Sequence, residues 1–285
     1  MRPMTIAHLV LGGTPAENID AAAAAGFDAV GLRICARRPG DPYTGDPILG
    51  NAAAARSLRA RAAARGIRVS NVSAYQFYPD VGWDDVAPVV DAAATLGAPI
   101  IVVNGFDPEL ARFTPLFAKY CAAANDAGIR IALEFLPYSG VRTIDEAMRV
   151  VMDSGAMNAG VLLDALHLDR SGGSVADIAR IPAARITFAQ LCDARQWTGP
   201  RTNEGLLTEA RTARLPAGAG DLPLFDFLDA LPADTEIEYE VARADLAEKT
   251  VLEKAQAAAA DAERFMDAYD THRRAVGAAA VASRA

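Results

Sequence analysis

Residues 127–135 read Ala-Gly-Ile-Arg-Ile-Ala-Leu-Glu-Phe and contain the repeating unit of this chain. Gly128 follows a helical stretch and supplies the left-handed conformation that ends a helix. The apolar run after it predicts a buried parallel strand over Arg130–Glu134. The same junction of helix, glycine and strand recurs at Gly26, Gly66 and Gly97. This repetition indicates consecutive βα units.

Eight short apolar runs predict strands at Thr5–Val10, Ala29–Arg33, Arg68–Val72, Ile100–Val103, Arg130–Glu134, Ala159–Leu163, Arg185–Ala189 and Glu236–Glu240. Alanine-rich stretches between them predict helices, among them Pro15–Ala25, Asn51–Arg65, Trp83–Leu96, Pro108–Ala127 and Thr143–Asp153. Eight such units predict an α/β fold, a (β/α)8 TIM barrel in a single domain. The alternative is an open doubly wound sheet, which usually has a glycine-rich phosphate loop after its first strand. Here that position reads Leu11-Gly-Gly-Thr-Pro15 and lacks the spacing.

We expect residues 1–274 to form the barrel, which a long helix over Ala244–Arg273 closes, and residues 275–285 to be a frayed tail. Two irregular stretches, Ala36–Gly50 and Asp193–Gly220, follow the second and seventh strands. The second of them contains a predicted short helix over Thr208–Ala213. Both belong to the carboxyl-terminal face, where barrel enzymes carry their chemistry.

Composition excludes several classes of protein. The 285 residues carry a formal charge of −8, which disfavours nucleic-acid binding. No apolar run reaches the roughly 18 residues of a membrane span. Three cysteines without paired spacing argue against a disulfide framework and favour the cytoplasm. The remaining partners are a small-molecule substrate and, as is common for such barrels, further copies of the chain in a homo-oligomer.

Polar side chains end four successive predicted strands: Glu134, Asp164, Gln190 and Glu240. Three carboxylates on one rim would repel one another, and a divalent cation removes that conflict. An all-oxygen set favours Mn²⁺ or Mg²⁺, with Co²⁺ and Zn²⁺ as further candidates. The alternative is structural: the carboxylates cap helices or pair with Arg33, Arg214 or Arg243.

Two of the three histidines lie near this rim. His167 follows Asp164 by three residues, just past a strand end. His8 lies inside the first predicted strand, where it belongs either to the core or to a substrate site.

Together these residues resemble the xylose-isomerase-like TIM-barrel superfamily, which includes sugar isomerases and epimerases, inosose and 3-dehydroshikimate dehydratases, and endonuclease IV. In this family a Glu ends strand 5, Asp-x-x-His follows strand 6, His or Gln ends strand 7 and Glu ends strand 8. The segment from Arg214 to Gly220 resembles the family's arginine before a Pro-Gly-x-Gly turn. Three histidines are too few for the zinc cluster of endonuclease IV.

The resemblance implies proton abstraction next to a carbonyl of a polyhydroxy or keto substrate, with the developing charge stabilised by the metal. Glu134 and Glu240 are then metal ligands and proton-transfer groups, and His167 contacts a substrate oxygen or protonates a departing hydroxide. The remaining expected substrate contacts are Arg214, Arg33 and His8.

Three functions follow from the resemblance. Return of the proton to carbon makes the protein an isomerase or epimerase, which we expect. Loss of a β-hydroxyl makes it a dehydratase, which Gln190-Leu-Cys-Asp193-Ala favours and the segment after the second strand disfavours for dehydroshikimate. The third possibility is a metal-binding barrel without catalysis.

Overall fold

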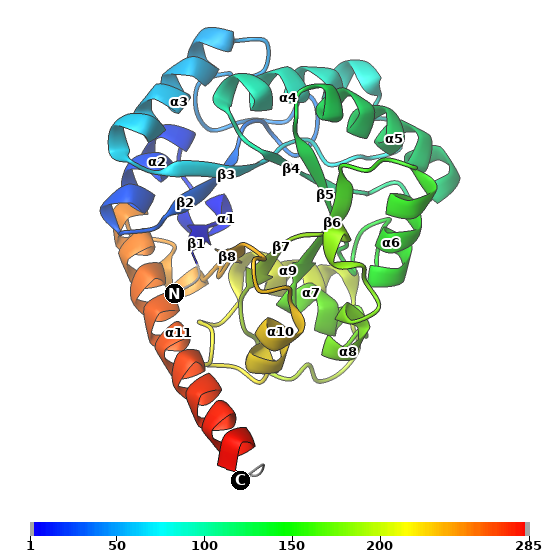
Figure 1. Cartoon of the computed structure of the whole chain (residues 1–285). Coiled ribbons are helices and arrows are strands. Elements are labelled where there is room, and N and C mark those ends of the chain that lie inside the picture. Colours follow the sequence, from blue (N-terminus) through cyan, green and yellow to red (C-terminus); the bar gives the residue numbers. More distant parts are fainter. Residues whose placement is uncertain (1–2, 283–285) are drawn as a thin grey trace.

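A computed structural model describes residues 3–282. Eight parallel strands close into a barrel in chain order, and β8 pairs back onto β1 (Figure 1). The strands are β1 (Met4–Ile6), β2 (Ala29–Arg33), β3 (Arg68–Ser73), β4 (Ile100–Asn104), β5 (Arg130–Glu134), β6 (Ala159–Asp164), β7 (Ile186–Leu191) and β8 (Ile237–Tyr239). The predicted (β/α)8 barrel is confirmed.

Helices surround the strands as an outer layer (Figure 1). They are α1 (His8–Leu11), α2 (Pro15–Ala24), α3 (Ala52–Arg65), α4 (Trp83–Leu96), α5 (Leu110–Asp126), α6 (Ile144–Asp153), α7 (Ala165–Arg170), α8 (Val175–Ile178), α9 (Asn203–Thr212), α10 (Leu224–Ala230) and α11 (Val251–Ala282), with 3-10 turns η1 (Ala183–Arg185) and η2 (Ala244–Leu246). The last helix packs against α1 and α2 and so closes the ring.

The first strand is shorter than the sequence predicts. It ends at Ile6, and after Ala7 the chain turns into α1, which begins at His8. The prediction of a strand over Thr5–Val10, with His8 inside it, is therefore wrong. A short apolar run does not distinguish a strand from a buried helical turn.

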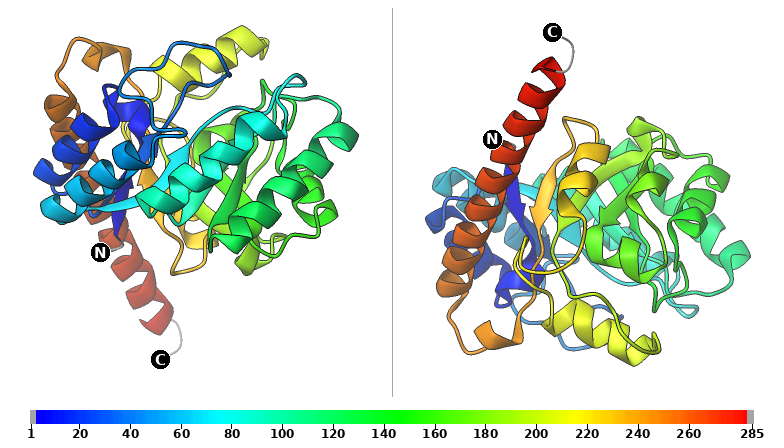
Figure 2. Two further views of the ribbon diagram at one scale, coloured as in Figure 1. Left: turned by 90° about the horizontal axis from the view of Figure 1, so that it is seen from above. Right: turned by 90° about the horizontal axis from the view of Figure 1, so that it is seen from below.

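The carboxyl-terminal helix also differs from its predicted bounds of Ala244–Arg273. Its first turn is fixed at Thr250, whose hydroxyl accepts a hydrogen bond from the Glu253 N–H at 3.2 Å. The helix then continues through residues 275–282, which we expected to fray, and extends beyond the barrel (Figure 2). Alanine, the strongest helix former, dominates this stretch. The rest of the predicted tail, residues 283–285, lies outside the described residues.

The two irregular segments lie where they were expected, after β2 and β7. Residues 34–51 contain neither helix nor strand. The segment after β7 contains α9, which begins earlier than the predicted Thr208–Ala213 because Thr202 caps it. The Thr202 hydroxyl accepts a hydrogen bond from the Gly205 N–H at 3.1 Å.

The barrel interior has an apolar layer beneath a polar one. A separate apolar cluster within the barrel consists of Ile100, Val102, Ala132, Leu162 and Phe188. Successive side chains alternate between the two faces of a strand, so residues two positions further along point the same way. The positions two residues beyond Val102, Ala132, Leu162 and Phe188 are Asn104, Glu134, Asp164 and Gln190. The strand period thus places a polar layer at the carboxyl end of the barrel.

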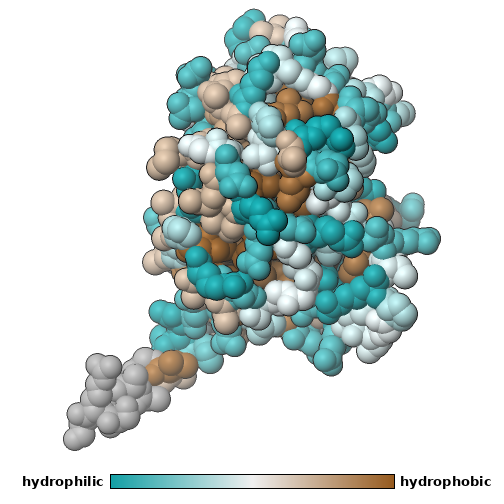
Figure 3. Space-filling model, turned by 90° about the vertical axis from the view of Figure 1, so that its right-hand side faces the viewer, coloured by the Kyte–Doolittle hydropathy of each residue, from teal (hydrophilic) through white to brown (hydrophobic). Residues whose placement is uncertain are grey.

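The outer surface is mixed in character. On the face shown in Figure 3, hydrophilic and apolar residues intersperse instead of gathering into one band. Among residues 3–282, no helix has the length and apolar character needed to cross a membrane.

Candidate metal centre

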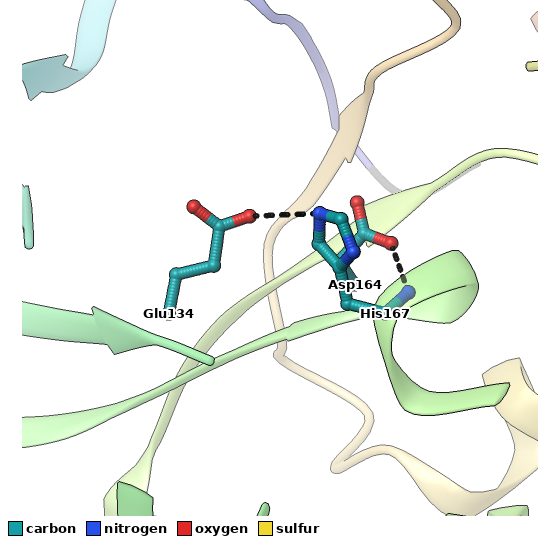
Figure 4. Close-up of side chains that lie close together, drawn as sticks. All are labelled: Glu134, Asp164 and His167. Carbon is teal, nitrogen blue, oxygen red and sulfur yellow. Dashed lines mark hydrogen bonds and ion pairs between the residues drawn. The ribbon is translucent and has the colours of Figure 1, made fainter. Parts of the chain in front are cut away.

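Glu134, Asp164 and His167 lie close together at the carboxyl ends of β5 and β6 (Figure 4). One ligand atom from each lies within 4.8 Å of the other two. His167 Nε2 is 3.8 Å from Glu134 Oε1. All three side chains are buried, and such a group can hold a metal ion.

Arg214 lies between the carboxylates of Asp164 and Glu240. Its guanidinium donates to Asp164 Oδ2 at 2.5 Å and forms an ion pair with Glu240 Oε2 at 3.0 Å. Asp164 also caps α7 by accepting a hydrogen bond from the His167 N–H at 2.9 Å. The structural roles that the sequence left open, capping and pairing with Arg214, are thus present. If all are ionised, Glu134, Asp164, Glu240 and Arg214 together carry a formal charge of minus two, which a divalent cation would offset.

Gln190 brings an additional oxygen to this rim. Its Nε2 donates to Glu238 Oε2 at 2.7 Å, and this bond fixes the orientation of the amide. Its Oε1 is buried and has no hydrogen-bond partner among the described residues. An unpartnered buried acceptor beside carboxylates is what a cation ligand requires. The structure thus brings Glu134, Asp164 and His167 together, while Glu240 pairs with Arg214 and Gln190 presents an unpartnered oxygen at the same rim.

Glu238 was not identified as a site residue from the sequence. It lies two residues before Glu240, on the inward face of β8, and its Oε1 accepts from Asn71 Nδ2 at 2.8 Å. Gly31 makes room for it, because a Cβ there would lie 2.4 Å from Glu238 Oε1. The alternation Glu-Ile-Glu-Tyr-Glu over residues 236–240 contained the signal, since period-two spacing puts all three glutamates on one face.

Burial changes the acidity of these groups. Burial, then Glu240 and Asp164, raise the pKa of Glu134 well above its usual value. Burial raises the pKa of Glu240 to about 7, although Arg214 opposes the shift. Burial also lowers the pKa of His167 to about 4, so its imidazole is neutral at physiological pH. A carboxyl with a pKa near 7 is suited to proton transfer at neutral pH.

A cavity of about 50 Å³ opens onto these groups, and Glu134, His167, Gln190, Arg214 and Glu240 line it. Asp164 has no exposed surface. Arg33 and His8 line the same cavity, and Arg33 Nε donates to His8 Nε2 at 3.1 Å. Burial, then Arg33, lower the pKa of His8, which favours the neutral imidazole that accepts this bond.

The expected substrate contacts therefore differ in character. Arg33 has no carboxylate within ion-pair distance among the described residues, whereas Arg214 is fully buried and balanced by two carboxylates. Two further arginines, Arg37 and Arg211, also line the cavity and were not identified from the sequence. They lie in the irregular segment after β2 and in α9, and only the fold brings them together.

Asp193 holds the turn that follows Arg214. Its Oδ1 accepts from the N–H groups of Ala194 and Leu222, and its Oδ2 from those of Gly218 and Gly220. A Cβ at Gly220 would lie 2.3 Å from Asp193 Oδ1, so glycine allows this close approach. This buried carboxylate thus helps to hold the motif from Arg214 to Gly220, together with backbone hydrogen bonds from Leu215 to Asp193 and from Arg214 to Ala242.

Two curated proteins are similar to this chain in sequence. The 3-dehydroshikimate dehydratase of Pseudomonas aeruginosa is 26% identical over 242 residues, which cover 79% of this chain and 35% of that protein. The enzyme of the same name from Pseudomonas putida is also 26% identical, with the same coverage. This chain spans about a third of the length of these curated relatives.

Solved structures show the same fold. An IolI protein with a bound zinc atom superposes with a TM-score of 0.77 at 18% identity, covering 94% of this chain and 99% of that one. D-psicose 3-epimerase from Clostridium cellulolyticum H10, solved with D-tagatose, gives a TM-score of 0.66 at 15% identity, covering 90% and 96%. The family model described as xylose isomerase-like TIM barrel matches residues 19–268. The chain belongs to the xylose isomerase-like TIM-barrel family.

Proposed function

We propose that the chain is a divalent-metal-dependent dehydratase of a cyclic β-hydroxy ketone that carries a carboxylate, of the 3-dehydroshikimate type. The observation that carries this proposal is the buried Oε1 of Gln190, which has no hydrogen-bond partner among the described residues and would serve as the strand-7 ligand. The sequence relatives support it, since both are 3-dehydroshikimate dehydratases. From the sequence we expected an isomerase or epimerase. The similarity to these two relatives favours a dehydratase instead.

Glu134, Asp164, Gln190 and Glu240 are the residues that would hold the metal, with Mn²⁺ or Mg²⁺ favoured by the oxygen donors. When bound, the ion polarises the ketone oxygen and stabilises negative charge that develops on it.

Glu240 acts as the base. Its carboxylate takes the proton from the carbon between the ketone and the carbon bearing the β-hydroxyl. It then returns that proton to the departing hydroxyl, which leaves as water. One C–H bond and one C–O bond break, and one C=C bond forms. Neutral His167 donates a hydrogen bond to the departing oxygen, which stabilises its developing charge.

The second candidate is an isomerase or epimerase of a keto-sugar. It is favoured by the presence of two glutamates with raised pKa values on separate strands, Glu134 on β5 and Glu240 just after β8. One of them would then remove the proton and the other would return it to carbon.

The test is turnover with Mn²⁺-loaded protein. Incubation with 3-dehydroshikimate should produce an aromatic product, 3,4-dihydroxybenzoate, which is followed by its ultraviolet absorbance. Glu240→Gln should lower kcat at least about 100-fold, as expected for the loss of an acid–base group. Glu236→Gln, at the other end of the same strand, is the matched control and should turn over normally.

Ketohexoses in D2O separate the two candidates. Deuterium appearing next to the carbonyl, without an aromatic product from dehydroshikimate, would identify an isomerase or epimerase instead. Tight Mn²⁺ binding with no turnover of either substrate would leave a non-catalytic barrel.

A further inference from the structure

Two cavities meet at the mouth of the barrel. The inner one, at about 50 Å³, has room for an ion and a water molecule but not for a ring. An outer cavity of about 540 Å³ shares Arg33, Arg37 and Arg211 with it as walls. A substrate whose reacting carbons face the inner cavity must therefore place the rest of its structure in the outer one.

Three arginines from separate parts of the chain converge at this junction. Arg33 ends β2, Arg37 lies in the segment after it, and Arg211 belongs to the last turn of α9. Arg33 is held in place by neutral partners, since its Nη1 donates to the Ala74 carbonyl at 2.9 Å and its Nε to His8. Such a pre-oriented guanidinium loses little freedom when a ligand binds.

This cluster has no ion-pair partner among the described residues, although Glu240 acts on Arg33 and Arg37 from a greater distance. Among residues 3–282, no carboxylate lies within 4.0 Å of the guanidinium groups of Arg33, Arg37 or Arg211, although Asp41 lines the outer cavity. The neighbouring Arg38 shows the contrast, because Asp80 binds it at 2.9 Å. All three arginines of the cluster are partly buried.

Mutual repulsion within the cluster supports this description. Burial, followed by Arg37, lowers the pKa of Arg33 to about 10. Burial, followed by Arg211, lowers the pKa of Arg37. An anion among the three would relieve this repulsion and accept charge-assisted hydrogen bonds from the planar guanidinium groups.

We propose that Arg33, Arg37 and Arg211 form a subsite that binds the carboxylate of the substrate at the junction of the two cavities. Arg214, whose charge Asp164 and Glu240 already balance, serves the metal site instead. The inference rests on the proposed function, in which the ketone and the β-hydroxyl of the same substrate react at the metal site. In this arrangement, β2 with the segment after it and α9 contribute the residues that bind the substrate's carboxylate.

Two ligand pairs test the subsite with Mn²⁺-loaded protein, measured by isothermal titration calorimetry. 3,4-Dihydroxybenzoate and catechol share the diol and differ in the carboxylate. Arg37→Gln and Arg211→Gln should each weaken binding of 3,4-dihydroxybenzoate about tenfold, the effect of one lost charged hydrogen bond, and leave catechol within twofold. Arg38→Gln is the matched control in the same cavity and should change neither.

Equal effects on both ligands, or no effect on either, would overturn the subsite. Ribose 5-phosphate and ribose form a second pair. Arginine-dependent preference for the phosphate alone would refute a carboxylate as the bound group. Binding can be measured without turnover. A wild type that is inactive but binds 3,4-dihydroxybenzoate in preference to catechol would therefore contradict the proposed dehydratase activity and not the subsite.

Discussion

Glu238 lies beneath the rim of the barrel and holds Gln190 by a hydrogen bond. Its two carboxylate oxygens accept from different amides, Gln190 on one side and Asn71 on the other. The first of these bonds decides which end of the Gln190 amide faces the cavity. A carboxylate beneath the ligands thus determines whether β7 presents an oxygen or an NH2 group.

Glu238→Ala should therefore weaken Mn²⁺ binding by about 10–100-fold, as loss of a partner behind a metal ligand does. Glu238→Gln keeps an oxygen that can accept from Gln190, so most of the affinity should remain. Calorimetric titration with Mn²⁺ measures both. Asn71→Ala is the control, because it leaves the bond to Gln190 intact; an unchanged dissociation constant in Glu238→Ala would contradict this role.

At the scale of the element, the connection from β7 to β8 depends on Asp193. Four backbone N–H groups converge on this one side chain, which is 1% exposed. The same connection carries Arg211 and Arg214, so its shape affects both the proposed subsite and the metal centre. No helix or strand spans residues 213–223, which are held by isolated bridges at Ala213 and Leu215 and by this carboxylate.

Asp193→Asn should lower the free energy of unfolding by about 2 kcal/mol or more. The amide retains one acceptor oxygen and turns an NH2 group toward buried N–H donors, which then lack partners. Urea denaturation measures the change. Asp221→Asn, on an exposed side chain of the same connection, should stay within about 0.5 kcal/mol. Equal stability of the two variants would show that Asp193 does not hold the turn.

For the whole molecule, the buried acidic groups couple stability to pH. Burial raises the pKa of Glu240 to about 7, and burial with Glu240 raises that of Glu238 to about 8, from an ordinary 4.5. The unfolded chain releases these protons at lower pH than the folded protein does. The stability that these two groups contribute is therefore fully present below about pH 4.5. It is lost as the pH rises through their pKa values in the folded protein. His167, with its lowered pKa of about 4, acts oppositely, but only below 6.5.

In chelator, Tm should therefore fall between pH 6.5 and about pH 8. Saturating Mn²⁺ should raise Tm and reduce this slope, since a ligand that binds only the folded state stabilises it. Thermal unfolding followed by circular dichroism across this range measures both effects. A Tm independent of pH in chelator would show that these glutamates are not held protonated by the fold.

The sequence alone determined the barrel and the rim. Glycine after four of the helices and eight buried apolar runs predicted eight βα units, and two strands, Ala29–Arg33 and Arg130–Glu134, match their predicted bounds. The sequence also predicted that one rim carries four polar side chains, because parallel strands in a barrel all end on one face. These are Glu134, Asp164, Gln190 and Glu240. These features are local or periodic, so they can be read along the chain.

Only the tertiary structure decided how charge is arranged around that rim. The pairing of Arg214 with Asp164, 50 residues away, and the convergence of Arg33, Arg37 and Arg211 join distant segments. The short helix α1, which begins at His8, likewise packs against β2 and the distant α11. A charge's partner is set by position in space, and the linear sequence carries no signal for contacts that the closing of the barrel creates.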